Sequence, residues 1–144
     1  MVKEITSFFV KSHAIRQSED IFAYLQKSLL SWGKFELDYK GIVQPPISFW
    51  KEFYSQLEPE ILGRVLRSYA YKNGGEIALS LIRGDNIISN IRSLTGPTRY
   101  EANSKETIRG KFGPYELPDT LVHASSPEEV EKDIRILRKY NLIR

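Results

Sequence analysis

The residues best suited to acid–base or nucleophilic chemistry near neutral pH are the chain's two histidines, because imidazole titrates in that range. They are His13 and His123. His123 lies in Thr120–Ser125 (TLVHAS), which reads as the end of a strand just before a helix begins. Unpaired backbone N–H groups at such a junction attract anions. His123 is therefore the leading catalytic candidate, and His13 is interpreted as a surface or capping residue.

Cations and hydroxyl groups accompany His123 in the sequence. Arg92 and Arg109 supply guanidinium groups, and Thr98 and Ser125 supply hydroxyls. A neutral imidazole can attack phosphorus while arginines neutralise the phosphoryl oxygens, so this combination is typical of a phosphoryl-transfer site. The alternative is a partly buried strand histidine bonded to a backbone carbonyl, and residue types alone leave that alternative open.

The composition excludes several other kinds of site. The absence of cysteine excludes disulfides, thiol nucleophiles, cysteine-ligated zinc and iron–sulfur clusters. The phosphate-loop, dinucleotide-binding and His-Glu-x-x-His motifs are absent as well. The formal net charge of +3 comes from 21 Lys and Arg against 18 Asp and Glu, which suits an anionic ligand. Acids interleave with most of the cations, so a nucleic-acid-binding module is the weakest alternative and no specific nucleic-acid partner is expected.

The chain also lacks the signs of membrane insertion or export. No apolar run approaches the roughly twenty residues of a membrane span. The first residues, Met1–Lys11, do not read as a signal peptide, because Glu4 and Lys11 interrupt a short apolar run. We therefore expect a cytoplasmic protein without a membrane partner.

The elements that must position these residues can be read from hydrophobic spacing. Four segments are predicted as strands: 5–10, 34–43, 77–82 and 121–125. Five are predicted as helices: 18–32, 48–54, 59–69, 85–94 and 126–141. Ser18 is the expected cap of the first helix, and Ser126–Glu129 (SPEE) predicts a capping box before the last. Residues 95–118 show no periodicity, and such long loops are usually functional or disordered.

The order of these elements indicates the fold class. Without the pair of central helices and the last helix, the order is β-α-β-β-α-β, the ferredoxin-like split. This predicts an α+β fold in which a four-stranded antiparallel sheet is flanked by helices packed mostly on one face. A length of 144 residues corresponds to a single domain over 1–144.

The long loop and the histidine segment resemble the signature region of the nucleoside diphosphate kinase family. Thr107–Gly113 (TIRGKFG) is similar to that family's Gly-Thr-Ile-Arg-Gly-Asp-Phe, and Val122–Ser126 (VHASS) to its Asn-x-x-His-Gly/Ala-Ser-Asp. Other similar segments follow in family order along most of the chain: Phe8–Lys11, Lys51–Tyr54, Arg83–Asn86 and Leu94–Thr98. The family fold is ferredoxin-like, as the element order predicts independently.

The resemblance implies an activity and a set of site residues. It implies ping-pong transfer of a γ-phosphate between nucleotides through a phosphohistidine on His123, with Mg²⁺ carried by the nucleotide phosphates and not by a protein metal site. The implied catalytic residues are His123, Lys11, Tyr54, Ser125 and Asp133. The implied nucleotide-binding residues are Lys11, Tyr54, Leu62, Arg92, Thr98, Arg109 and Thr120. The implied partners are nucleoside di- and triphosphates such as ATP and GTP, and homo-oligomers are common in the family.

Three departures from the family pattern favour an alternative function. The family's Lys-Pro-Asp-Gly turn is replaced by Lys11–Ala14 (KSHA), and Thr120 replaces its asparagine. Asp133 replaces a glutamate, and its shorter side chain is expected to need a water or a shifted helix to orient His123. The alternative is a catalytically weak or inactive nucleotide-binding or regulatory domain on the same fold.

Most of the implied site residues also have an interpretation without function. Lys11 could be a solvated lysine at a strand end, and Arg92 an exposed helix charge. Tyr54 and Leu62 could fill the core, and Thr98 could be a turn residue after a proline. Their joint order along the chain favours the functional interpretation.

Overall fold

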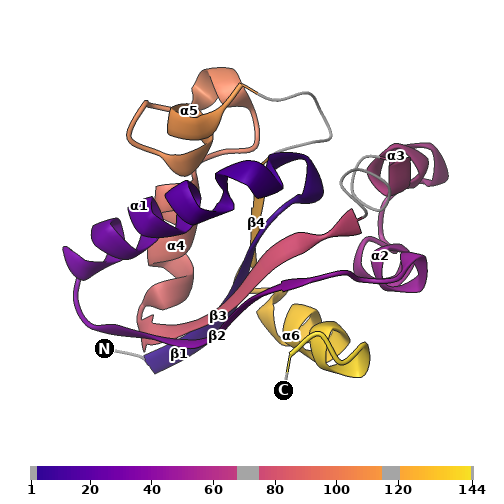
Figure 1. Cartoon of the computed structure of the whole chain (residues 1–144), viewed down its shortest axis with the longest axis horizontal. Coiled ribbons are helices and arrows are strands. Elements are labelled where there is room, and N and C mark those ends of the chain that lie inside the picture. The colour runs from indigo at the N-terminus through magenta and orange to yellow at the C-terminus, as the bar shows by residue number, and fades with distance from the viewer. Residues whose placement is uncertain (1–2, 68–74, 115–120, 144) are drawn as a thin grey trace.

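A computed structural model describes residues 3–67, 75–114 and 121–143 (Figure 1). Four strands form one antiparallel sheet in the order β2-β3-β1-β4. The strands are β1 (Lys3–Val10), β2 (Phe35–Val43), β3 (Ile77–Asp85) and β4 (Val122–Ala124). The α-helices are α1 (Ser18–Leu30), α2 (Ile47–Phe53), α3 (Pro59–Val65), α4 (Ile87–Thr95), α5 (Ile108–Phe112) and α6 (Val130–Lys139). The predicted ferredoxin-like α+β fold is confirmed.

Helices cover both faces of the sheet, and the expectation that they pack mostly on one face is wrong. Figure 1 shows α1 and α4 on one side of the sheet and α6 on the other. The cause lies in β1, where consecutive aromatic residues point to opposite faces. Phe8 packs edge-on against Phe22 of α1 at 5.7 Å, and Phe9 packs against Trp50 of α2 at 6.0 Å. A strand that is apolar on both sides needs cover on both sides.

The chain leaves β1 through a short 3-10 helix, η1 (Ser12–Gln17), which the sequence pattern does not predict. The backbone N–H of Ala14 donates to the carbonyl of Lys11 at 2.9 Å, so the chain coils directly after the strand. As a result α1 is capped at Gln17, and Ser18 is its first residue, not its cap. This tight turn lies at the segment where the family resemblance would place a proline turn.

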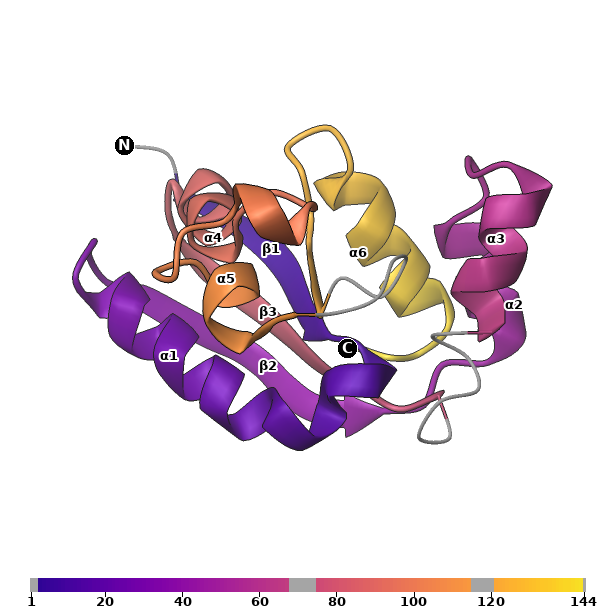
Figure 2. The same cartoon turned by 90° about the horizontal axis from the view of Figure 1, so that it is seen from above.

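The part of the 95–118 segment that the structure describes contains regular structure, contrary to expectation. It forms a 3-10 helix, η4 (Tyr100–Ala102), and α5. The hydroxyl of Thr107 caps α5 by accepting from the N–H of Gly110 at 3.0 Å. The Asn103 amide donates to the carbonyls of Pro97 and Arg99, and its oxygen accepts from the Thr107 hydroxyl. Figure 2 shows α5 beside α1, where Tyr24 donates to the Glu106 carbonyl.

The start of α6 also differs from the prediction. The hydroxyl of Ser126 donates to the carboxylate of Glu129 at 2.7 Å, but Glu129 is itself the cap and Val130 the first helical residue. Residues 126–129 form a turn, because the N–H groups of Glu129 and Val130 both donate to the Ser126 carbonyl.

Helices α2 and α6 are joined at their exposed sides by Glu52. Its carboxylate accepts hydrogen bonds from the Lys139 ammonium at 2.8 Å and from the Tyr140 hydroxyl at 2.9 Å. These bonds, that from Lys139 first, lower the pKa of Glu52 below its usual value. The same pairing raises the pKa of Lys139. The contact fixes α2 relative to α6, and both helices approach His123.

Candidate active site

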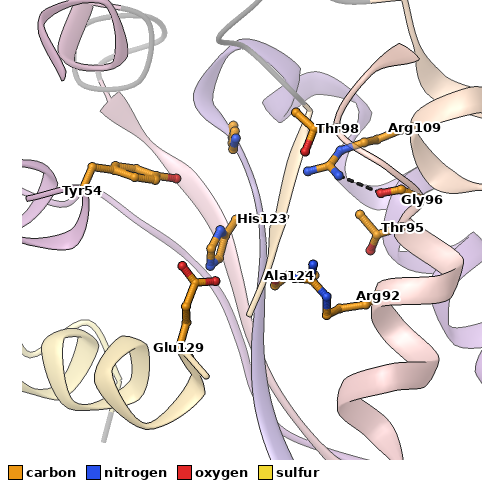
Figure 3. Close-up of a pocket in the computed structure, with 10 residues that line it drawn as sticks. Tyr54, Arg92, Thr95, Gly96, Thr98, Arg109, His123, Ala124 and Glu129 are labelled. Atoms are coloured by element: carbon orange, nitrogen blue, oxygen red, sulfur yellow. Dashed lines mark hydrogen bonds between the residues drawn. The ribbon is translucent and has the colours of Figure 1, made fainter. Parts of the chain in front are cut away.

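His123 lies at the centre of β4, opposite Phe9 of β1. Its side chain is 14% exposed and reaches a pocket of about 280 Å³. Figure 3 shows the pocket between the end of α2, strand β4 and the C-terminal part of α4. The lining residues are Lys11, Tyr54, Arg92, Thr95, Gly96, Thr98, Arg109, His123, Ala124 and Glu129.

One nitrogen of the imidazole is fixed by a buried carboxylate. His123 Nε2 lies 2.9 Å from Oδ2 of Asp133, which projects from α6. A carboxylate accepts hydrogen bonds, so Nε2 carries the proton and Nδ1 is the nitrogen that keeps its lone pair. The contact is direct, so of the two expected ways for Asp133 to orient His123, a bridging water is not needed. The turn at 126–129 brings α6 close enough for the shorter acid to reach.

Two buried serines continue this network behind the imidazole. The Ser125 hydroxyl donates to the same Asp133 oxygen at 2.7 Å. Ser125 therefore accepts from the Ser7 hydroxyl, 2.5 Å away on β1. Asp133 is thus held by a second donor, which restricts the carboxylate and with it the imidazole.

Two arginines border the pocket and bond to the strand that carries His123. Arg109 donates to the Gly96 carbonyl at 2.7 Å and to the Val122 carbonyl at 3.0 Å. Arg92 donates to the Ala124 carbonyl at 3.1 Å. A guanidinium presents its five N–H donors in a planar fork, so these contacts orient each group beside the pocket.

Lys11 is buried, so the alternative that it is only a solvated lysine at a strand end is wrong. It is 4% exposed, lines the pocket and follows directly on β1. Its backbone N–H donates to the Leu121 carbonyl at 2.8 Å, which fixes the lysine beside the start of β4. Lysine is rarely buried to this degree without a partner or a function.

The positions of the other implied residues are mixed. Tyr54, Arg92, Thr98 and Arg109 line the pocket, while Ser125 and Asp133 lie behind His123. Leu62 lies half-buried on α3 and is not among the lining residues. Thr120 lies outside the described residues. Sequence reasoning missed Thr95, Gly96, Ala124 and Glu129, although Ala124 and Gly96 adjoin residues that it singled out.

Gly96 is a backbone requirement of the pocket. Its φ is +88°, and a Cβ there would lie 1.9 Å from Oδ1 of Asn103. We expect Gly96→Ala to lower the free energy of unfolding by about 1–3 kcal/mol, because it combines backbone strain with a clash. Urea unfolding followed by circular dichroism measures this. Gly63→Ala on α3 is the control, since its Cβ would meet nothing closer than 3.7 Å, and it should raise stability by about 0.5–1 kcal/mol.

The family profile and the related proteins of known name both point to nucleoside diphosphate kinase. The family profile described as nucleoside diphosphate kinase matches residues 4–141. The nucleoside diphosphate kinase of Methanocaldococcus jannaschii is 31% identical over 90 residues, which are 62% of this chain and 56% of that protein. The chain thus spans about half the length of that relative.

Solved structures share the fold at low identity. Nucleoside diphosphate kinase from Halobacterium salinarum, in complex with CDP, superimposes with a TM-score of 0.78 and 20% identity over 94% of this chain and 87% of that chain. A transition-state mimic of the Borrelia burgdorferi enzyme with vanadate and ADP gives 0.77 and 17%, again over 94% and 87%. The profile match covers nearly all of the sequence, and the solved structures share the fold. The chain therefore belongs to the nucleoside diphosphate kinase family.

Proposed function

We propose that this chain, as one domain over 1–144, is a nucleoside diphosphate kinase that transfers a γ-phosphate through a phosphohistidine on His123. The observation that carries the proposal is the setting of the imidazole. Asp133 holds Nε2, and the adjoining pocket is lined by Lys11, Arg92 and Arg109. An imidazole held in one tautomer is a nucleophile through its other nitrogen, and three cations suit a triphosphate.

The chemistry proceeds in two matched half-reactions. The Nδ1 lone pair of His123 forms a bond to the γ-phosphorus, and the bond from that phosphorus to the β–γ bridging oxygen breaks. The nucleoside diphosphate leaves with that electron pair. In the second half-reaction a terminal oxygen of another nucleoside diphosphate attacks the phosphorus, and the N–P pair returns to Nδ1. The Nε2 proton stays on the ring, where Asp133 balances the positive charge that develops.

The other residues have supporting roles in this proposal. Arg92, Arg109 and Thr98 bind the β- and γ-phosphates, and Lys11 and Tyr54 contact the sugar and the transferred phosphate. Leu62 is proposed to contact the base, and Thr120, which lies outside the described residues, is proposed to contact the sugar. Most contacts go to phosphate and sugar, so ATP, GTP and other nucleotides should serve. Homo-oligomeric assembly, which the family resemblance implies, and a cytoplasmic location complete the proposal.

Mg²⁺ enters this proposal bound to the nucleotide. Among the described residues, no group of three or more His, Asp or Glu side chains is placed to hold a metal ion. The lining fits a metal–nucleotide complex, since it joins cationic groups for phosphate oxygens to one carboxylate, Glu129, on the His123 side (Figure 3). When bound, Mg²⁺ neutralises part of the phosphate charge.

A labelling experiment tests the function. The protein is incubated with γ-labelled ATP and Mg²⁺ and then denatured, and the label should be acid-labile and alkali-stable. Addition of unlabelled GDP should remove the label as GTP. Folded protein that takes no label but still binds ADP in a calorimeter would instead support the alternative of a nucleotide-binding domain without turnover. None of the described helices is long and apolar enough to cross a bilayer.

A further inference from the structure

The His123 ring is enclosed by two phenylalanines that have no place in the mechanism so far. Phe9 of β1 stacks on the imidazole, with ring centroids 5.0 Å apart and planes at 26°. Phe53 of α2 meets the imidazole edge-on at 5.1 Å and 75°. Both are buried, at 0% and 2% exposure. One face of the nucleophile is therefore covered by an aromatic ring, and a second ring closes another side.

These two rings are themselves fixed by neighbours. Phe9 and Phe53 contact each other at 5.9 Å. Phe53 also stacks on Phe49 at 5.1 Å, and Phe9 packs against Trp50. Apart from Phe9, the members of this cluster belong to α2, which Glu52 joins to α6. Close-packed aromatic groups of this kind do not yield space without a loss of contacts.

Together with Asp133, the phenylalanines restrain the imidazole from three sides. Asp133 fixes Nε2, Phe9 fixes the plane of the ring, and Phe53 blocks rotation out of that plane. A hydrogen bond alone allows the ring to tilt about its axis, whereas stacking does not. The side of the ring that remains accessible faces the pocket and the arginines.

We propose that Phe9 and Phe53 are positioning residues that hold His123 in a single orientation, so that phosphate is received on Nδ1 and not on Nε2. This rests on the proposed function, because it concerns the same phosphoryl transfer. Neither phenylalanine is among the residues that line the pocket. They act on the rate and the site of N–P bond formation and not on substrate affinity.

The test compares three Phe→Leu variants. Phe9→Leu and Phe53→Leu remove the flat faces against His123 and keep most of the apolar volume. Phe22→Leu is the matched control, because Phe22 is equally buried but belongs to α1 and packs against Phe8 on the other face of the sheet. In the first two we expect the phosphorylation rate constant to fall roughly fivefold per ring, with unchanged ADP affinity. We also expect part of the phosphate on Nε2, seen as a second phosphohistidine isomer by ³¹P NMR.

The outcomes separate this proposal from the function on which it rests. The control should lose stability but keep the rate and the single isomer. Unchanged rates and a single Nδ1 isomer in both Phe9→Leu and Phe53→Leu would overturn the positioning role. If the wild-type protein takes no phosphate from ATP, phosphoramidate replaces it as a donor that needs no nucleotide site. A loss of Nδ1 selectivity only in Phe9→Leu and Phe53→Leu would then still support the positioning role of the two phenylalanines. Equal selectivity in the wild-type protein and all three variants would reject it.

Discussion

Replacement of His123 by alanine is expected to abolish phosphate exchange between nucleotides, with a loss of at least about 10⁴-fold in turnover. The reason is that the variant has no group at this position that can form the covalent intermediate. Asp133 and the serines behind it would remain in place, but an acid bonded only to Ser125 cannot substitute for the nitrogen nucleophile. The measurement is steady-state conversion of GDP to GTP with ATP as donor, alongside trapping of the labelled protein.

The chain offers a matched histidine control for this variant. His13→Ala removes the other histidine, which lies on η1 and is not among the residues that line the pocket. It should retain the label and most of the turnover. If the His123→Ala protein still carried acid-labile phosphate, the nucleophile would have to be sought elsewhere, and His13 would be the first residue to test.

Replacement of Arg109 by alanine should lower the rate of phosphorylation about a hundredfold, the usual effect of removing one donor to developing negative charge. The structure fixes this guanidinium more firmly than that of Arg92, through the carbonyls of Gly96 and Val122. It is therefore preorganised, so the loss should fall mainly on the transition state and less on nucleotide affinity. Single-turnover phosphorylation at saturating ATP measures the effect.

Arg99→Ala serves as the control for Arg109. Arg99 belongs to the same segment, 95–118, and is exposed, and its side chain is not part of the described pocket lining. Both variants change the net charge by the same amount, so a general electrostatic effect on an anionic substrate would slow both equally. Equal rates in the two variants would remove Arg109 from the site.

The elements of the fold are largely predictable because most have strong hydrophobic patterns. Strands 5–10 and 77–82 and the main helices lie within a few residues of their predicted positions. The elements that the pattern misses, η1, η4 and α5, contain only three to six residues, too few to show a period. Helices pack on both faces of the sheet because Phe8 and Phe9 point to opposite faces of β1. A short apolar run in the sequence does not show that both faces of the strand are buried by helices.

The sequence predicts which residues form the candidate site but not which side chains contact one another. Joint order along the chain selects His123, Arg92, Arg109 and Lys11, and the structure brings these residues to one pocket. Whether the Asp133 carboxylate reaches His123 depends on where the backbone places α6. The direct bond therefore depends on the turn at 126–129 and not on side-chain length alone. The contacts of Phe9 and Phe53 with the imidazole are likewise invisible in sequence, since both residues read only as core.

The two arginine contacts to β4 have a consequence for the sheet as a whole. This strand lies at the edge, and the carbonyls of Val122 and Ala124, on either side of His123, are occupied by guanidinium groups. Open backbone groups at a sheet edge invite pairing with another chain. Here any added strand would have to displace both arginines, so the groups proposed to hold substrate also protect this edge from aggregation and from extension by an extra strand.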